Sequence, residues 1–198
     1  MQTTINTTMK CYLKNAGMLL CLAASALTVF ADDSANLIKN PYFESIDGKI
    51  TAWGQKEKGT LESFNNPADS EQCGRISFTY ATEDKAMAKS NIFQSIANLA
   101  PGDYILSFSC SGEDLKAIFT VVRFQKEPGF TNTDSVGKFE KYIGENKVPL
   151  KGEWKDFVFS FKVPEGSAAG TIIFEVFGVP EQTGYALIKN VRLVKQEE

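Results

Sequence analysis

Apolar and polar residues alternate with a period of two along most of the chain after residue 31. Residues 104–109 are the clearest case, and alternation of this kind indicates a strand with one buried face. The side expected to face inward carries Tyr104, Leu106 and Phe108. A second apolar segment, 92–96, precedes it, with Pro101 and Gly102 between the two. This arrangement predicts two antiparallel strands joined by a tight turn.

The same signature recurs in short segments throughout the chain. Segment 115–125 is apolar on both faces until its end, which is typical of a central strand. Helical periodicity is not convincing anywhere after residue 31, so about nine short strands predict an all-β sandwich. The other predicted strands are an opening edge strand from Asn36 to Asn40, weak strands near 50–53 and 60–64, and strands within 73–82, 139–143, 157–163, 172–177 and 185–195. The longest irregular stretch, 127–152, is of a length that is usually functional or mobile.

The N-terminal segment has the features of an export signal. Its apolar run, 16–30, follows two lysines and is too short to span a bilayer comfortably. Val29 and Ala31 fit the −3 and −1 positions of a signal-peptidase site. We therefore expect residues 1–31 to be a cleaved signal peptide and residues 32–198 to be one secreted or periplasmic domain.

The net charge of that domain limits the classes of partner that it can bind. The chain has 21 basic and 24 acidic residues. Residues 1–31 contain two lysines and no acids, which leaves 19 basic and 24 acidic residues and a net charge of −5. A mildly acidic chain without a basic cluster is a poor ligand for nucleic acid. Residues 32–198 also contain no apolar run long enough to span a membrane.

Two cysteines remain in the expected domain, Cys73 and Cys110. Export permits a disulfide, but two buried thiols fit a domain of this size equally well. Cys73 has the opposite parity to the apolar positions that follow it, so pairing would need an irregular strand. The sequence leaves the two alternatives open.

Catalytic chemistry is restricted because the chain contains no histidine. This excludes Ser-His-Asp and Cys-His nucleophiles and every imidazole-bound metal. A glycosidase-like pair of carboxylates is formally allowed. Only Glu175 lies within a confident apolar strand, however, and no pattern places a second acid beside it.

Aromatic side chains with polar neighbours are the main candidates for binding, since a ring can stack on the apolar face of a sugar. They are Trp53, Tyr80, Phe130, Tyr142, Trp154 and Phe177. Trp154 begins an amphipathic strand, so we expect it in the core. Tyr80 shares the parity of Ile76 and is expected there too, unless the strand end protrudes. For Trp53 a core position and an exposed one are evenly balanced.

Two polar residues lie inside apolar strands. Glu175 must face water or be paired; we expect it to face a shallow groove, with an ion pair to Arg123 or Arg75 as the alternative. Gln94 shares the parity of the apolar positions beside it, so we expect it to be buried and hydrogen-bonded to the backbone.

Several segments together resemble a known family. They are NLIKNPYFE, AWG, IFQSIANLAPGDYILSFS, GEWKDFVFSFKVP, TIIFEVFG and YALIKNVRL. This succession is similar to the carbohydrate-binding modules of the family 4/9/22, or CenC-like, type and covers nearly all of residues 32–198. The resemblance implies a galactose-binding-like jelly-roll β-sandwich of two antiparallel sheets that binds polysaccharide in a groove on the concave sheet, without catalysis.

The resemblance carries over to individual residues only in part. Glu175 matches a ligand-contacting glutamate on the penultimate strand of some relatives, and Ile173 stands where relatives often have an aromatic residue. Tyr80 falls near a tryptophan of the relatives, and Trp53 matches the tryptophan after the opening strand. Relatives also hold a structural calcium ion with a glutamate after the first strand, which Glu44 matches.

The final strand of the family usually carries adjacent aspartates that help to hold this ion. Here they are replaced by Lys189 and Asn190. Lysine brings a positive charge to the position of the cation, so we expect no cofactor and place calcium in doubt.

We therefore predict a protein that binds poly- or oligosaccharide in a groove that combines Tyr80, Arg123, Gln125, Glu175 and Phe177, with Trp53 as an additional platform. The alternative is an exported adhesion domain that has lost the sugar site and contacts another envelope or secreted protein. A glycan-active hydrolase ranks third.

Overall fold

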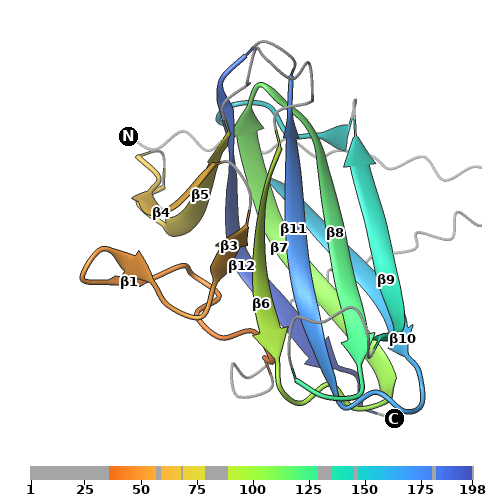
Figure 1. Ribbon diagram of the computed structural model, residues 1–198. Coiled ribbons are helices and arrows are strands. Elements are labelled where there is room, and N and C mark those ends of the chain that lie inside the picture. The colour runs from red at the N-terminus through yellow and green to blue at the C-terminus, as the bar shows by residue number, and fades with distance from the viewer. Residues whose placement is uncertain are drawn as a thin grey trace, which may run out of the picture. The chain divides into compact units, whose positions relative to one another are not determined.

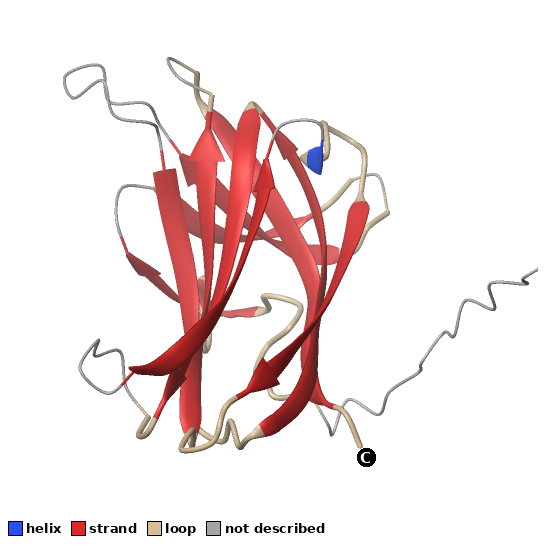
Figure 2. Cartoon of the chain, turned by 90° about the vertical axis from the view of Figure 1, so that its right-hand side faces the viewer, coloured by secondary structure: helices blue, strands red, loops and turns tan. Residues whose placement is uncertain are grey.

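The structure is a computed structural model that describes residues 36–56, 59–67, 69–78, 89–128, 135–144, 147–179 and 182–197. Contacts divide the chain into residues 1–31 and 32–198, and every described residue belongs to the second unit. Twelve strands make up nearly all of its regular structure (Figure 2). In the described ranges, no helix is long and apolar enough to cross a membrane.

The strands form two five-stranded antiparallel sheets and one short hairpin. In spatial order, the first sheet contains β10 (Lys155–Val163), β7 (Gly102–Glu113), β12 (Gly184–Lys195), β5 (Gln72–Phe78) and β4 (Thr60–Asn65). The second contains β3 (Gly54–Lys56), β6 (Lys89–Ile96), β11 (Ala169–Gly178), β8 (Leu115–Gln125) and β9 (Ser135–Gly144). The hairpin is β1 (Ser45–Ile46) with β2 (Lys49–Ile50). In Figure 1, the second sheet lies in front of the first. The predicted all-β jelly-roll β-sandwich is confirmed.

The core lies between the two sheets and is built from the inward side of each alternating strand. Tyr104, Leu106 and Phe108 on β7 are at most 2% exposed, as their parity predicts. The Phe108 ring meets the ring of Phe174 on β11 edge to face at 4.9 Å. This contact joins the two layers at their centre, because β7 and β11 belong to different sheets.

The prediction that residues 92–109 form a hairpin is wrong. β6 pairs with β3 and β11, whereas β7 pairs with β10 and β12, so the two strands lie in opposite layers. The turn at Pro101 and Gly102 crosses the edge of the sandwich, although Gly102 does take the positive φ that was expected. A tight turn and two amphipathic strands are common to hairpins and to crossovers, so the pattern alone does not separate them.

The opening segment is also different from the prediction, because residues 36–40 form no strand. They are held against β12 by one backbone hydrogen bond, from Leu37 N to Leu193 O at 2.9 Å. The side chain of Gln94 fixes the same segment: its amide oxygen accepts from Lys39 N and its amide nitrogen donates to Lys39 O, both at 2.7 Å. The expected burial and backbone bonding of Gln94 are therefore confirmed.

The two cysteines of the domain are free thiols in this fold. Cys110 belongs to the core between the sheets, whereas Cys73 lies on the opposite face of β5, where its thiol contacts Phe64 O at 3.3 Å. Burial raises the pKa of the Cys73 thiol to about 11 and raises the pKa of Cys110 further. Both thiols are therefore protonated and shielded at neutral pH.

We expect Cys73 and Cys110 to stay unmodified when the native protein is treated with iodoacetamide at pH 8, and to react fully in guanidinium chloride. Peptide mass spectrometry of the labelled protein distinguishes each cysteine from the others in the chain. Recovery of a Cys73–Cys110 disulfide peptide from protein handled without reductant would contradict the structure.

Candidate functional site

We call the side of the second sheet that points away from the core its front face. Alternation on β11 sends Ile172, Phe174 and Val176 into the core and Ile173, Glu175 and Phe177 to the front. Ile173 and Val121 are only 4% and 5% exposed, yet neither belongs to the core cluster. They form the floor of the front face, and the longer side chains around them form its rim.

Strand register places five front-face residues in one row across the sheet. Lys56 of β3 lies opposite Asn91 of β6, which lies opposite Glu175 of β11. Glu175 lies opposite Phe119 of β8, and Phe119 opposite Tyr142 of β9. Neighbouring strands are about 4.8 Å apart, so the row extends over roughly 19 Å. We call this set the central row.

Glu175 is the distinctive member of the central row. It is half-buried, yet its carboxylate makes no hydrogen bond or ion pair with any described residue. The alternative ion pair to Arg75 is ruled out, because Arg75 lies on the other sheet, where it pairs with Glu62 at 3.5 Å. Arg123 lies opposite Thr171, four residues from Glu175 along β11, so it is not the cross-strand neighbour of Glu175. A half-buried carboxylate without a partner is costly in a fold and free to accept hydrogen bonds from a ligand.

Aromatic residues occupy neighbouring positions of the front face. Phe119 is its cross-strand neighbour on β8, and Phe177 follows two positions later on β11; both are half-buried. Tyr142, beside Phe119, is 58% exposed. Phe93 lies over Gly54, where an added Cβ would be 2.6 Å from its ring, so a larger residue would push the ring aside. The front face thus offers apolar ring surfaces next to an acceptor group.

Three of the predicted site residues are on the front face and accessible, namely Arg123, Glu175 and Phe177. Gln125 has the expected parity but is 2% exposed and accepts a hydrogen bond from Thr171 Oγ1 at 3.0 Å, so it does not reach a ligand. Tyr80 lies outside the described residues.

Trp53 is in the core, so its proposed role as a binding platform is wrong. It is 7% exposed, its ring stacks on Phe43 with 4.8 Å between centroids, and its Nε1 donates to Asn40 O at 3.0 Å. The chain turns at Ala52, which has a φ of 67°, and this turn directs the indole inward.

The sequence did not single out Asn91, Phe93, Phe119 or Lys56 as site residues. Phe119 could have been found by parity alone, because it alternates with the inward Ile118 exactly as Arg123 does. The other three depend on which strand lies beside β11, and that is set by the crossover at Pro101, which the sequence leaves ambiguous.

The outer face of the first sheet, which we call the back face, is cross-linked by a buried lysine. Lys189 Nζ is 2.7 Å from Asp69 Oδ2 and 2.6 Å from Glu71 Oε2, and it lies 4.0 Å from the centroid of the Trp154 ring. Trp154 is half-buried here, so its predicted core position is wrong. The lysine ties the β4–β5 turn and the start of β10 to β12.

This arrangement does not fit the calcium ion that the family resemblance implies. The carboxylates of Asp69 and Glu71 both pair with the Lys189 ammonium, which is the cation at this position. The described ranges contain no group of three or more His, Cys, Asp or Glu side chains that could hold a metal. Near the first strand, the Asn40 amide donates to Glu44 O at 2.8 Å and to Thr51 O at 3.0 Å, so each of these carbonyls already has a hydrogen-bond donor.

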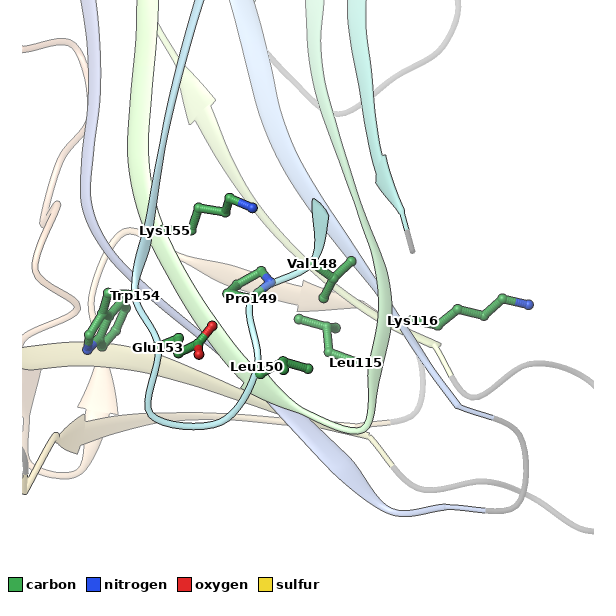
Figure 3. Close-up of a pocket in the computed structure, with 8 residues that line it drawn as sticks. All are labelled: Leu115, Lys116, Val148, Pro149, Leu150, Glu153, Trp154 and Lys155. Atoms are coloured by element: carbon green, nitrogen blue, oxygen red, sulfur yellow. The ribbon is translucent and has the colours of Figure 1, made fainter. Parts of the chain in front are cut away.

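A hollow of about 550 Å³ lies at one end of the sandwich, between the start of β8 and the 147–154 loop. Figure 3 shows Leu115, Val148, Pro149 and Leu150 gathered around it, with the Lys116 side chain pointing away. The loop is fixed by the ion pair of Lys151 with Glu113 at 2.8 Å. Lys116, Glu153, Trp154 and Lys155 also line the hollow, and the Trp154 ring is covered by Lys189. Glu153 is exposed, whereas Glu175 is half-buried without a partner among the described residues, so the front face is the better candidate.

Residues 35–183 match the sequence profile of a family described as carbohydrate binding domain. The chain belongs to this family. No curated protein is similar enough in sequence to match the chain.

Solved structures share the fold of this carbohydrate-binding domain at low identity. TmCBM61, in complex with β-1,4-galactotriose, has 17% identity and a TM-score of 0.52, covering 81% of this chain and 99% of that one. A putative sugar binding protein from Bacteroides thetaiotaomicron has 15% identity and a TM-score of 0.54, covering 81% and 100%. The enzymatically active domain of bacteriophage CBA120 tailspike protein 4 has 17% identity and a TM-score of 0.59. The similarity covers 83% of this chain but only 22% of the tailspike chain.

The Lys189 cross-link gives the carbohydrate-binding domain a testable pH dependence. The hydrogen bond from Lys189 lowers the pKa of Asp69, so its stabilisation is present above the ordinary value of 3.8 and is lost as pH falls through the lowered pKa. Burial alone would lower the pKa of Lys189, but hydrogen bonds to Asp69 and Glu71 outweigh it and raise the pKa. Its stabilisation is present below 10.5 and is lost as pH rises through the raised pKa.

We expect Lys189→Met to lower the melting temperature at pH 7 by roughly 2–8 °C. The difference from the wild type should shrink in acid below the Asp69 pKa and in base above that of Lys189. Thermal unfolding followed by circular dichroism across pH measures it. Lys162→Met, at an exposed position of β10, is the control and should change little; an equal effect of both variants would contradict the role of the cross-link.

Proposed function

We propose that this carbohydrate-binding domain holds a poly- or oligosaccharide on its front face, without catalysis. The observation that carries the proposal is the unpaired Glu175 carboxylate between Asn91 and Phe119. Sugars present hydroxyl donors at their edges and apolar C–H surfaces on their faces. A carboxylate accepts strong hydrogen bonds from the hydroxyl groups, and aromatic rings pack against the C–H surfaces.

Different residues of the central row would supply the hydrogen bonds and the ring contacts. Lys56, Asn91 and Glu175 supply polar groups on one half of the sheet, and Phe119 and Tyr142 supply rings on the other. A sugar chain lying over the row would place its hydroxyl edge on Glu175 and an adjacent ring on Phe119. The apolar floor beneath, at Ile173 and Val121, excludes water and strengthens these hydrogen bonds.

A binding role without catalysis is supported by the absence of a suitable second acid among the described front-face residues. Glycoside hydrolysis needs two carboxylates that flank one bond. Glu140 is the other acid on these strands, but it lies on β9, two strands from Glu175, and pairs with Lys138. The central row includes Lys56 and Glu175, and charged residues are depleted in the cores of protein–protein interfaces, which favours a sugar ligand over an adhesion surface.

We also propose that the protein is exported through a cleaved signal peptide. The N-terminal segment, with its lysines, apolar run and Val29 and Ala31, supports export to the periplasm or the medium. N-terminal sequencing of protein expressed in a bacterial host should find Asp32 first; a product that keeps residues 1–31 would contradict export by cleavage.

We expect Glu175→Gln to weaken sugar binding at least tenfold, because a charged acceptor contributes about 1.5–3 kcal/mol to a hydrogen bond. Its melting temperature should stay nearly unchanged, since Glu175 has no partner to lose. Affinity electrophoresis against a glycan panel identifies a ligand, and isothermal titration calorimetry then measures the affinity of each variant.

Glu62→Gln, on the back-face side of β4, is the matched control and should bind like the wild type. Binding should also survive excess EDTA, since we propose that no calcium is needed. Absence of binding to every glycan by folded protein would overturn the proposed function, and a large loss of stability in Glu175→Gln would overturn the assignment of Glu175.

A further inference from the structure

β10 is an edge strand with one open side. On its other side it pairs with β7 along its full length of nine residues, without a register shift. No other described strand pairs with β10, and Figure 1 shows it at the same side of the sandwich as β9, the edge of the second sheet. Backbone N–H and C=O groups on an open edge of this length are a template for pairing with another strand.

The features that commonly block an open edge are scarce on β10. The strand contains no proline, no glycine and no bulge. Its outward side carries Val158, which is 64% exposed. Its inward side carries three half-buried rings, one of which, Phe161, stacks on Phe139 of β9 at 4.6 Å between centroids. The three rings belong to Phe157, Phe159 and Phe161.

The sequence of β10 is complementary to itself when two copies run antiparallel with Phe159 opposite Phe159. In this register Asp156 of each copy lies opposite Lys162 of the other, so the junction contains two pairs of opposite charge. Phe157 then lies opposite Phe161, and Val158 opposite Ser160. Pairs of opposite charge and pairs of aromatic rings at directly opposed positions stabilise antiparallel sheets.

The charged residues favour this register over its neighbours. Opposed residues of an antiparallel pair point to the same side, so the register can move only in steps that keep the parity of the strand. Centring the pair on Val158 would place Asp156 opposite Ser160, and centring it on Ser160 would place Lys162 opposite Val158. Either shift loses both pairs of opposite charge.

The two charges are also available for a second copy. Lys162 is exposed and makes no hydrogen bond or ion pair with any described residue. Asp156 is exposed as well, and Ser109 Oγ donates to only one of its carboxylate oxygens, at 2.6 Å. On the neighbouring edge strand β9, by contrast, Lys138 and Glu140 already neutralise each other within the strand.

We infer that β10 pairs with β10 of a second copy of this chain, antiparallel and centred on Phe159, so that the first sheets of the two copies join into one continuous sheet. Since opposed residues point to the same side, the front faces of both copies then also point to the same side. One long sugar chain can therefore contact both faces, and binding at two linked sites raises the apparent affinity. This gain rests on the proposed function, whereas the pairing of β10 does not.

Sedimentation velocity of the purified protein over a wide range of concentrations tests the pairing. We expect a reversible dimer that forms as the concentration is raised, and a weak one, because a single strand edge buries less surface than a standard interface. Hydrogen exchange of the β10 amides should slow over the same range. A monomer at every concentration would overturn the inference.

Charge exchange identifies the strand and the register. Lys162→Asp sets two carboxylates opposite each other, and Asp156→Lys sets two ammonium groups opposite each other. Each variant should weaken the dimer at least about tenfold. The double variant carrying both changes restores opposite charges with the roles exchanged, so the dimer should return.

Lys49→Asp, at an exposed position of the β1–β2 hairpin, makes the same change of charge and is the control that should dimerise like the wild type. The melting temperature of dilute Lys162→Asp should equal that of the wild type, which shows that the monomer is intact. An unaltered dimer in both single variants, or no recovery in the double variant, contradicts the proposed register. Each of these outcomes leaves sugar binding at Glu175 intact, because a short oligosaccharide binds one copy alone.

Discussion

The pairing of β11 between β6 and β8 is the constraint on which the rest of this structure depends. β11 is hydrogen-bonded on both sides over most of its length, so its register fixes what stands beside each of its residues. A slip by one residue would send Glu175 into the core and Phe174 to the surface. The cost of burying that carboxylate and exposing that ring holds the strand in place, and the same register assembles the central row.

The front face departs from what stability alone would favour. It leaves the half-buried carboxylate of Glu175 without a partner among the described residues. On the first sheet, by contrast, Arg75 pairs with Glu62, and its guanidinium lies 4.5 Å from the centroid of the Tyr185 ring. Departures of this kind are typical of functional sites, where the missing partner is supplied by a ligand.

On the back face, one buried lysine links segments of the first sheet through ion pairs and a ring contact. Lys189 stands on β12, but its ammonium reaches two carboxylates on the β4–β5 turn and one aromatic ring at the start of β10. A lysine holds these segments as a cation would, with a charge supplied by the chain itself.

The sequence by itself determined the fold class and whether individual side chains point into the core or away from it, because period-two alternation is a local property of each strand. It correctly gave the inward Tyr104, the buried Gln94 and the outward Glu175. Only the tertiary structure decided which strands are neighbours, since a Pro-Gly turn fits a hairpin and a crossover equally well. The sheet partners of β11 follow from that choice, whereas the core position of Trp53 goes with the turn at Ala52.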